Sequence, residues 1–196
     1  MSILDAREPV PDVRIGGPRD TATTSMRELH LIRHAKSCRD DGTRADFDRP
    51  LSERGRRDAP CMARQLAEQM ARQPARGPSN ITRLVTSPAL RALQTARLFA
   101  PVLEVTEHRF DLRPEVYEAT AATLLALINS FPADAARVAL IGHNPGISTL
   151  ARLLAPCPFV EMPTCAVISL AFDRDWDRIE PQAGRVLCYL TPEGIR

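Results

Sequence analysis

Four side chains that could act on a phosphoryl group stand at or just after the ends of predicted strands: Arg33, His34, Arg91 and His143. Arginine keeps its charge and presents a planar fork, so two arginines could hold phosphoryl oxygens from two directions. A neutral imidazole can attack phosphorus, and the positive charge of Arg33 disfavours protonation of His34. His143 could then stabilise the charge on the equatorial oxygens. This combination predicts phosphoryl transfer with His34 as the nucleophile.

Buried strands are expected to position these groups. The apolar run 29–32 predicts a short strand at the centre of a parallel sheet, with Arg33 and His34 at its carboxyl end. Residues 81–86 and 138–141 predict two further strands. Because open α/β sheets bind ligands at the carboxyl ends of their strands, one shared crevice is expected.

The two later strands are each followed by a cap-type residue and a proline. Ser87 and Pro88 predict the start of a helix that carries Arg91 within about its first turn. Asn144 is expected to cap, and Pro145 to open, a second helix. The N-terminus of this second helix would add backbone N–H groups and a positive dipole end to the crevice.

The remaining pattern predicts an α/β fold. Apolar residues at helical spacing, Met62, Leu66 and Met70 among them, predict a helix after residue 55, and another is expected at 124–128. Further strands are expected near 103–106, at 166–172 and at 186–190, and the last two should pair as a hairpin at one edge of the sheet.

Composition limits the class of protein. The chain has 196 residues, 44% hydrophobic and 26% charged, with a net charge of +2. This suits one domain, expected at 26–196, after a flexible leader at 1–25. No nucleic-acid or membrane footprint is present, and a cytoplasmic protein is predicted. The five cysteines include no Cys-x-x-Cys pair, so neither a disulfide framework nor a zinc knuckle is indicated.

Several segments carry a resemblance to a known family: 33–37, 87–96 and 142–146, with 46–55 and 117–119 between them. Together they resemble the histidine phosphatase superfamily, also called phosphoglycerate-mutase-like, and within it the short SixA-type branch of phosphohistidine phosphatases. Ala35 stands where many members have glycine, and the short branch often shows alanine there. The resemblance implies a three-layer α/β/α sandwich with a mostly parallel sheet and a phosphohistidine intermediate on His34. It also implies phosphate contacts from Arg33, Arg91 and His143, and neither metal nor cofactor.

The resemblance does not decide which residue is the general acid that protonates the leaving group. The larger phosphatases and mutases supply a glutamate from the loop that corresponds to 111–119, where Glu115 is the first candidate and Glu118 the second. A phosphoramidate leaving group would need less help from an acid. Ser37 follows the nucleophile closely and is a candidate for contact with a phosphate oxygen.

Two other readings of the motif region are less favoured. His30 lies four residues before His34, but the segment predicts a strand and lacks the glutamate of a His-Glu-x-x-His metal site. Cys38 and Arg44 match the Cys-x5-Arg spacing of a cysteine phosphatase, but two aspartates between them would repel phosphate.

The predicted function is a metal-independent phosphatase that acts on phosphohistidine of a protein. A phosphatase of small phosphate esters or sugar phosphates is the alternative enzyme. A catalytically silent module that binds phosphoproteins is the alternative from another class. The expected partner is therefore a phosphorylated protein or a small phosphorylated substrate.

Overall fold

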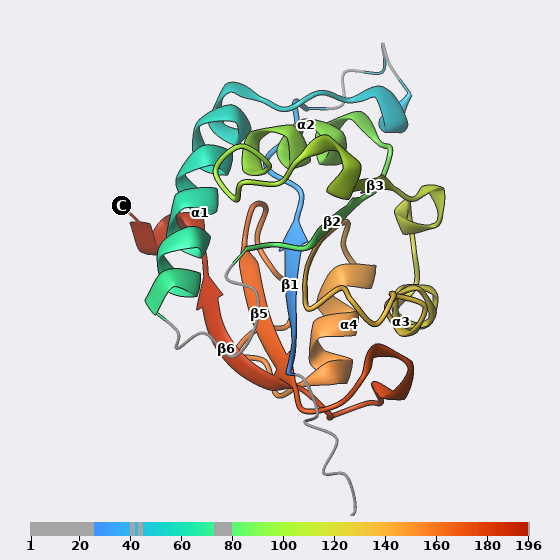
Figure 1. Ribbon diagram of the computed structural model, residues 1–196. Coiled ribbons are helices and arrows are strands. Elements are labelled where there is room, and N and C mark those ends of the chain that lie inside the picture. Colours follow the sequence, from blue (N-terminus) through green and yellow to red (C-terminus); the bar gives the residue numbers. More distant parts are fainter. Residues whose placement is uncertain (1–25, 40–41, 43–44, 73–79, 196) are drawn as a thin grey trace, which may run out of the picture.

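A computed structural model describes residues 26–39, 42, 45–72 and 80–195 (Figure 1). The expected leader at 1–25 and Arg44 lie outside the described residues. The strands of the described chain are β1 (Arg27–Arg33), β2 (Arg83–Thr86), β3 (Phe110–Leu112), β4 (Arg137–Gly142), β5 (Val167–Phe172) and β6 (Arg185–Leu190). They form one sheet in the order β3-β2-β4-β1-β5-β6. Strands β1 to β4 run parallel, β5 runs antiparallel to β1, and β6 runs antiparallel to β5.

Helices cover both faces of this sheet (Figure 1). They are α1 (Glu53–Arg72), α2 (Leu90–Phe99), α3 (Ala121–Asn129) and α4 (Gly146–Leu154). The apolar core divides accordingly into two clusters. Leu29 and Leu31 of β1 pack with α3 and α4, whereas Ile32 packs with α1 and α2, because successive side chains of a strand point to opposite faces. The predicted three-layer α/β/α sandwich with a mostly parallel sheet is confirmed.

Helix α1 shows why local pattern predicts these layers well. Its buried residues recur every three or four positions and include Met62, Leu66 and Met70, as the spacing predicts. The hairpin of β5 and β6 at one edge of the sheet is also confirmed. Among the helices of the described chain, none is long and apolar enough to cross a membrane.

The strand expected near 103–106 is wrong. The chain continues from α2 into further turns, in which the N–H groups of Val102 and Leu103 donate to the carbonyl of Phe99. Leu103 is buried by this turn rather than by strand pairing. The strand that flanks β2 is instead β3, which pairs Phe110 with Leu84 and includes the start of the loop expected at 111–119.

The start of α2 also differs from its prediction. The helix begins at Leu90 with Ala89 at the cap position and no side-chain cap. Ser87 Oγ accepts a hydrogen bond from the N–H of Ala89 at 3.2 Å, so Ser87 and Pro88 build a turn that precedes the helix. This turn leads the chain from β2 into α2.

A similar correction applies to α4. Pro145 occupies the cap position, and the first helical residue is Gly146. Asn144 does not cap the helix, because its Oδ1 accepts from the hydroxyl of Ser148 at 2.6 Å while its amide donates to the carbonyl of Met162. Asn144 therefore ties the strand end to the segment before β5.

Candidate active site

The carboxyl ends of the parallel strands bring the four predicted side chains together. Arg33 is the last residue of β1 and is paired in register with Gly142, the last residue of the neighbouring strand β4. His34 and His143 follow these two residues, and their ring centroids lie 5.0 Å apart. Arg91 enters from the first turn of α2, with its Nε 3.3 Å from His34 Nε2. Strand pairing therefore converts two distant stretches of sequence into one cluster.

The ring of His34 is held in one tautomer. Its Nδ1 lies 2.8 Å from the carbonyl oxygen of Ala35, and because a carbonyl can only accept, Nδ1 carries the proton. Nε2 is then left with a lone pair, toward which Arg91 Nε–H points. Nε2 is therefore the ring nitrogen that has a lone pair available.

Burial is the main reason that the pKa of His34 falls to about 3. The hydrogen bond to the Ala35 carbonyl opposes this shift, and the neighbouring His143, Arg91 and Arg33 reinforce it. The imidazole is therefore neutral at physiological pH, as an attack on phosphorus requires.

The peptide group that follows His34 is held in place by a hydrogen bond to a side chain of helix α2. Thr95 Oγ1 accepts from the N–H of Ala35 at 3.0 Å and donates to the carbonyl of Arg91 at 2.7 Å. From the other side, a Cβ on Gly55 would lie 2.1 Å from the carbonyl oxygen of Lys36. Only glycine lets the first turn of α1 approach the loop this closely.

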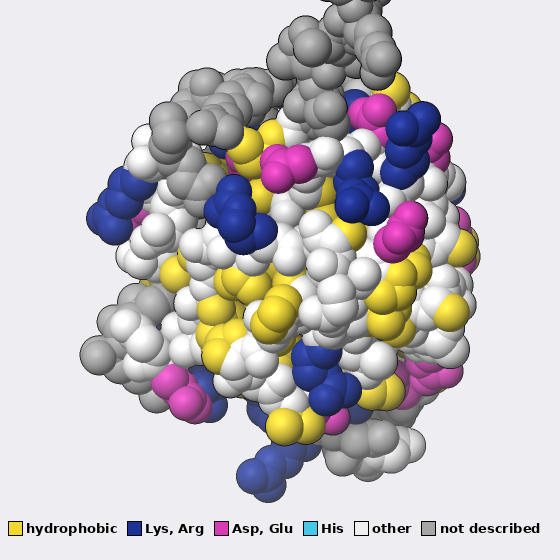
Figure 2. Space-filling model, turned by 90° about the horizontal axis from the view of Figure 1, so that it is seen from below, with side chains coloured by type: hydrophobic (Ala, Val, Ile, Leu, Met, Phe, Trp, Pro, Cys, Tyr) yellow, Lys and Arg dark blue, Asp and Glu magenta, His cyan; other side chains and the backbone are white. Residues whose placement is uncertain are grey.

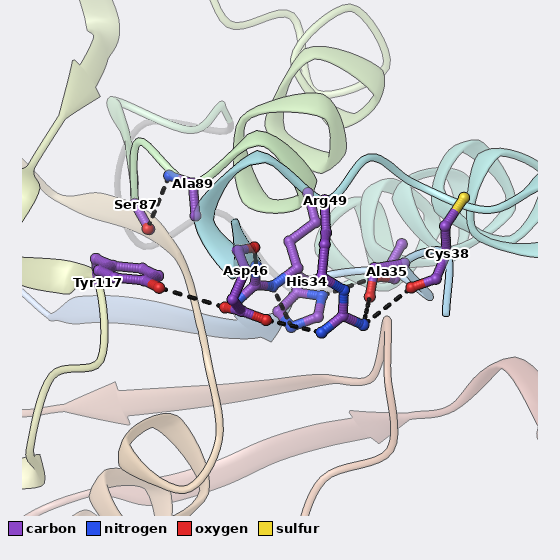
Figure 3. A network of polar contacts seen from close by, with 10 residues as sticks. His34, Ala35, Cys38, Asp46, Arg49, Ser87, Ala89 and Tyr117 are labelled. Carbon is purple, nitrogen blue, oxygen red and sulfur yellow. Dashed lines mark hydrogen bonds and ion pairs between the residues drawn. The ribbon is translucent and has the colours of Figure 1, made fainter. Parts of the chain in front are cut away.

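Arg91 is hydrogen-bonded to Asp46, which belongs to a loop for which the sequence predicts no role in the site. Its Nη1 donates to the backbone carbonyl of Asp46 at 2.5 Å, and its Nη2 donates to the Asp46 carboxylate at 2.8 Å. The same carboxylate accepts from Arg49 at 2.7 Å and from the Tyr117 hydroxyl at 3.3 Å (Figure 3). Partial burial alone would raise the pKa of Asp46, but Arg49 and Arg91 outweigh it and hold this pKa below its usual range.

His143 and Arg33 carry polar atoms with no partner. Both ring nitrogens of His143 and the Nε of Arg33 are buried without a hydrogen bond in the described part of the chain. Arg33 is anchored through its Nη1, which donates to the carbonyl of Met162 at 2.6 Å. Burial lowers the pKa of His143 to about 4, Arg91 and Arg33 add to this shift, and Asp46 opposes it. Since buried polar atoms normally have partners, these atoms mark a place for a polar ligand.

Comparison with known proteins agrees with this geometry. The family model described as the histidine phosphatase superfamily (branch 1) matches residues 29–121. An uncharacterized chloroplastic protein of Arabidopsis thaliana is 30% identical over 164 residues, which are 80% of this chain and 72% of that protein. The chain belongs to the histidine phosphatase superfamily. Membership of this superfamily supports phosphatase activity.

Solved structures share the fold of this chain. The protein histidine phosphatase SixA in complex with tungstate is 25% identical, with a TM-score of 0.67, and the match covers 86% of this chain and 99% of that one. SixA from Nakamurella multipartitia is 22% identical, with a TM-score of 0.68 over 85% and 96% of the two chains. A phosphoglycerate mutase from Bacillus anthracis is 16% identical, with a TM-score of 0.60 over 82% and 95%. The expected phosphoglycerate-mutase-like fold and the SixA-type resemblance are confirmed.

The two candidates for the general acid lie in different surroundings. Both residues are exposed, and the Glu115 carboxylate lies 3.4 Å from the guanidinium of Arg113. Glu118 lies near the hydroxyl of Tyr117, and the Tyr117 ring meets the ring of His143 edge-on at 5.6 Å. Glu118 is therefore the candidate that the fold connects to the histidine pair, and the assignment of an acid stays a prediction.

The loop that carries these candidates is packed tightly against α4. A Cβ on Gly146 would lie 2.0 Å from the carbonyl oxygen of Ala119, so this close approach requires glycine.

Ser37, the predicted phosphate contact, is buried and accepts from Arg49 Nη2 at 3.0 Å. Its own hydroxyl hydrogen can still be donated.

Sequence reasoning had little means of finding Asp46, Arg49 and Thr95. The segment 46–55 contributed to the family resemblance, but no spacing links an exposed polar loop to the first turn of α2. The predicted site histidines, His34 and His143, in contrast follow the carboxyl ends of β1 and β4. Figure 2 looks onto the end opposite the carboxyl ends of the parallel strands, and no histidine side chain is visible among the residues coloured there.

Proposed function

We propose that this protein is a metal-independent phosphatase that hydrolyses phosphohistidine of a protein through a phosphohistidine intermediate on His34. The observation that carries the proposal is the ring of His34. It is neutral, its Nδ1 proton is committed to the Ala35 carbonyl, and its Nε2 lies among Arg91, His143 and Arg33.

The geometry supports a two-step reaction. Arg33, Arg91 and His143 hold the phosphoryl oxygens, and the lone pair of His34 Nε2 forms a bond to phosphorus. The bond to the leaving group breaks, and its electron pair departs with that group. Water then attacks phosphorus, the bond from phosphorus to Nε2 breaks, and inorganic phosphate leaves while solvent takes the proton of the water. Nε2 regains its lone pair, so the enzyme returns to its starting state.

The leaving group is the reason for preferring phosphohistidine. Within the described residues, the contacts of His34 are with a carbonyl, an arginine and a histidine, and none is with a carboxylic acid. An imidazole leaving group can take a proton on its second nitrogen from solvent, whereas an alkoxide depends on an acid placed beside it. The likeness to a structure described as a protein histidine phosphatase also supports this substrate class.

The test uses two substrates, a protein phosphorylated on histidine and a generic aryl phosphate, both in the presence of a chelator. The native protein is compared with His34→Ala and with His108→Ala, which removes an exposed histidine outside the site. We expect turnover of the phosphohistidine protein by the native protein and by His108→Ala, and none by His34→Ala. Rapid quenching should trap an acid-labile phosphoryl group on His34.

The other outcomes would favour a different function or refute the mechanism. A strong preference for the aryl phosphate would favour the phosphatase of small esters. Binding of the phosphoprotein without turnover of either substrate would favour the silent binding module. Undiminished activity of His34→Ala would refute the proposed mechanism.

A further inference from the structure

The Asp46 carboxylate binds Arg91, the arginine to which the proposed function assigns phosphoryl oxygens. All three nitrogens of the Arg91 guanidinium are engaged by the protein itself. Nε points at His34 Nε2, Nη1 at the backbone oxygen of Asp46, and Nη2 at the Asp46 carboxylate. Planar recognition of this kind is also how arginine holds a phosphate. A phosphoryl group that reaches the nucleophile therefore meets an arginine whose donors already hold an anion.

The two partners of this ion pair differ in accessibility. The side chain of Arg91 is 8% exposed, whereas that of Asp46 is 43% exposed. Arg91 is anchored in α2, and Asp46 belongs to a short 3-10 turn, Asp46–Asp48, with no buried residue. The Asp46 carboxylate can therefore rotate toward solvent, while the Arg91 guanidinium stays in place.

A second arginine holds the carboxylate ready to return. Arg49 Nη1 donates to Asp46 at 2.7 Å, and its Nη2 donates to Ser37 Oγ and to the Cys38 carbonyl at 3.0 and 2.9 Å. These contacts tie the turn to the loop that follows the nucleophile, and the Tyr117 hydroxyl adds a further donor (Figure 3). The anion is thus kept beside the site even when it does not contact Arg91.

We propose that Asp46 is a built-in competitor of the phosphoryl group: its carboxylate leaves Arg91 when substrate binds and returns to displace inorganic phosphate. The inference rests on the proposed function only in assigning phosphoryl oxygens to Arg91. Two anions within hydrogen-bond distance of one another repel, so carboxylate and phosphate exclude each other at Nη2. Asp46 accordingly weakens the binding of product as well as substrate, and so keeps inorganic phosphate from occupying the site.

The test compares Asp46→Asn with Asp48→Asn. Asp48 is an exposed residue of the same turn, and its carboxylate makes no ion pair or hydrogen bond with the rest of the described chain. Both variants remove one negative charge, so the control reports the general change in field. Binding of tungstate and of inorganic phosphate is measured by calorimetry without turnover, and thermal unfolding shows that both variants fold.

We expect Asp46→Asn to bind both oxyanions roughly two- to fivefold more tightly, within the range for a partly exposed ion pair. KM and the inhibition constant of phosphate should fall together, with kcat unchanged or lower. Asp48→Asn should leave all of these values near those of the native protein.

Three results would overturn the inference. Weaker oxyanion binding with a higher KM in Asp46→Asn would show that Asp46 only positions Arg91. Equal tightening in both variants would show a general charge effect, and unchanged affinity would show no competition. Tighter oxyanion binding without turnover of a phosphohistidine protein would instead refute the proposed function and leave this inference standing.

Discussion

Replacement of Thr95 by valine tests how the nucleophile is positioned. The Thr95 side chain is fully buried, and its hydroxyl accepts from the N–H of Ala35 at 3.0 Å. Valine has nearly the same shape, so Thr95→Val leaves no cavity and removes only the hydroxyl. The buried N–H of Ala35 then loses its acceptor, while the carbonyl of the same residue still faces His34 Nδ1 at 2.8 Å.

The magnitude follows from this single orphaned donor. An unsatisfied buried N–H costs about 1–3 kcal/mol. For a domain of this size, each kcal/mol lowers the unfolding midpoint by about 2–4 °C, so a decrease of about 2–12 °C is expected. A looser Ala35 peptide also lets the His34 ring turn away from its line of attack. We expect kcat/KM to fall on the order of 10- to 100-fold, because small misplacements of a reacting group carry costs of this size.

The assay combines thermal unfolding with steady-state kinetics. Thr95→Ser keeps the acceptor and should recover most of the activity, while Thr149→Val changes an exposed threonine of α4 and measures the cost of the replacement alone. A loss in kcat larger than any change in KM would identify Thr95 as a positioning residue. Native kcat/KM in Thr95→Val would refute the reasoning, and a lower midpoint with full activity would restrict Thr95 to a structural role.

Two further predictions concern protonation. Burial lowers the pKa values of His30, His34 and His143 to about 3, 3 and 4, below their ordinary value of 6.5, so the unfolded chain binds more protons. Their contribution to stability is complete above pH 6.5 and is lost as pH falls toward 4, by about 1.4 kcal/mol per histidine at pH 5.5. Unfolding titrations at pH 7.5 and 5.5 measure this loss, and an unchanged free energy of unfolding would contradict neutral burial. For the acid, Glu118→Gln should lower kcat on an alkyl phosphate about 10- to 100-fold and much less on phosphohistidine, whereas Glu115→Gln should change neither. The reverse pattern in kinetics with both substrates would assign the acid to Glu115.

Local pattern was enough to predict the central strands and the place of His34 at the end of one of them. A run of apolar residues that ends on Arg33 and His34 forms a central strand because only burial on both faces accommodates such a run. The same reasoning applies to β4 and the histidine after it. Since parallel strands end at one edge of a sheet, strand type places His34 and His143 at the same edge, and the direct pairing of β1 with β4 brings their rings together.

Where local preference is weak, the pattern failed. Residues 103–106 include two apolar side chains, Leu103 and Val105, yet hydrogen bonds to the end of α2 turn the chain back toward the core. Ser87 and Asn144 are good cap residues, but each finds another partner at the strand end. Such choices depend on which donors and acceptors the rest of the fold brings near.

The sequence by itself determined most of the strands and the strand ends that carry the two histidines, because burial and side-chain period are properties of short segments. Only the tertiary structure decided the Nδ1 tautomer of His34, the clamp by Thr95 and the contact of Asp46 with Arg91. Each depends on the direction of single polar groups. Asp46 and Arg91, for example, lie 45 residues apart in the sequence. Hydrogen bonds of this kind are set by the path of the whole chain, which no short pattern records.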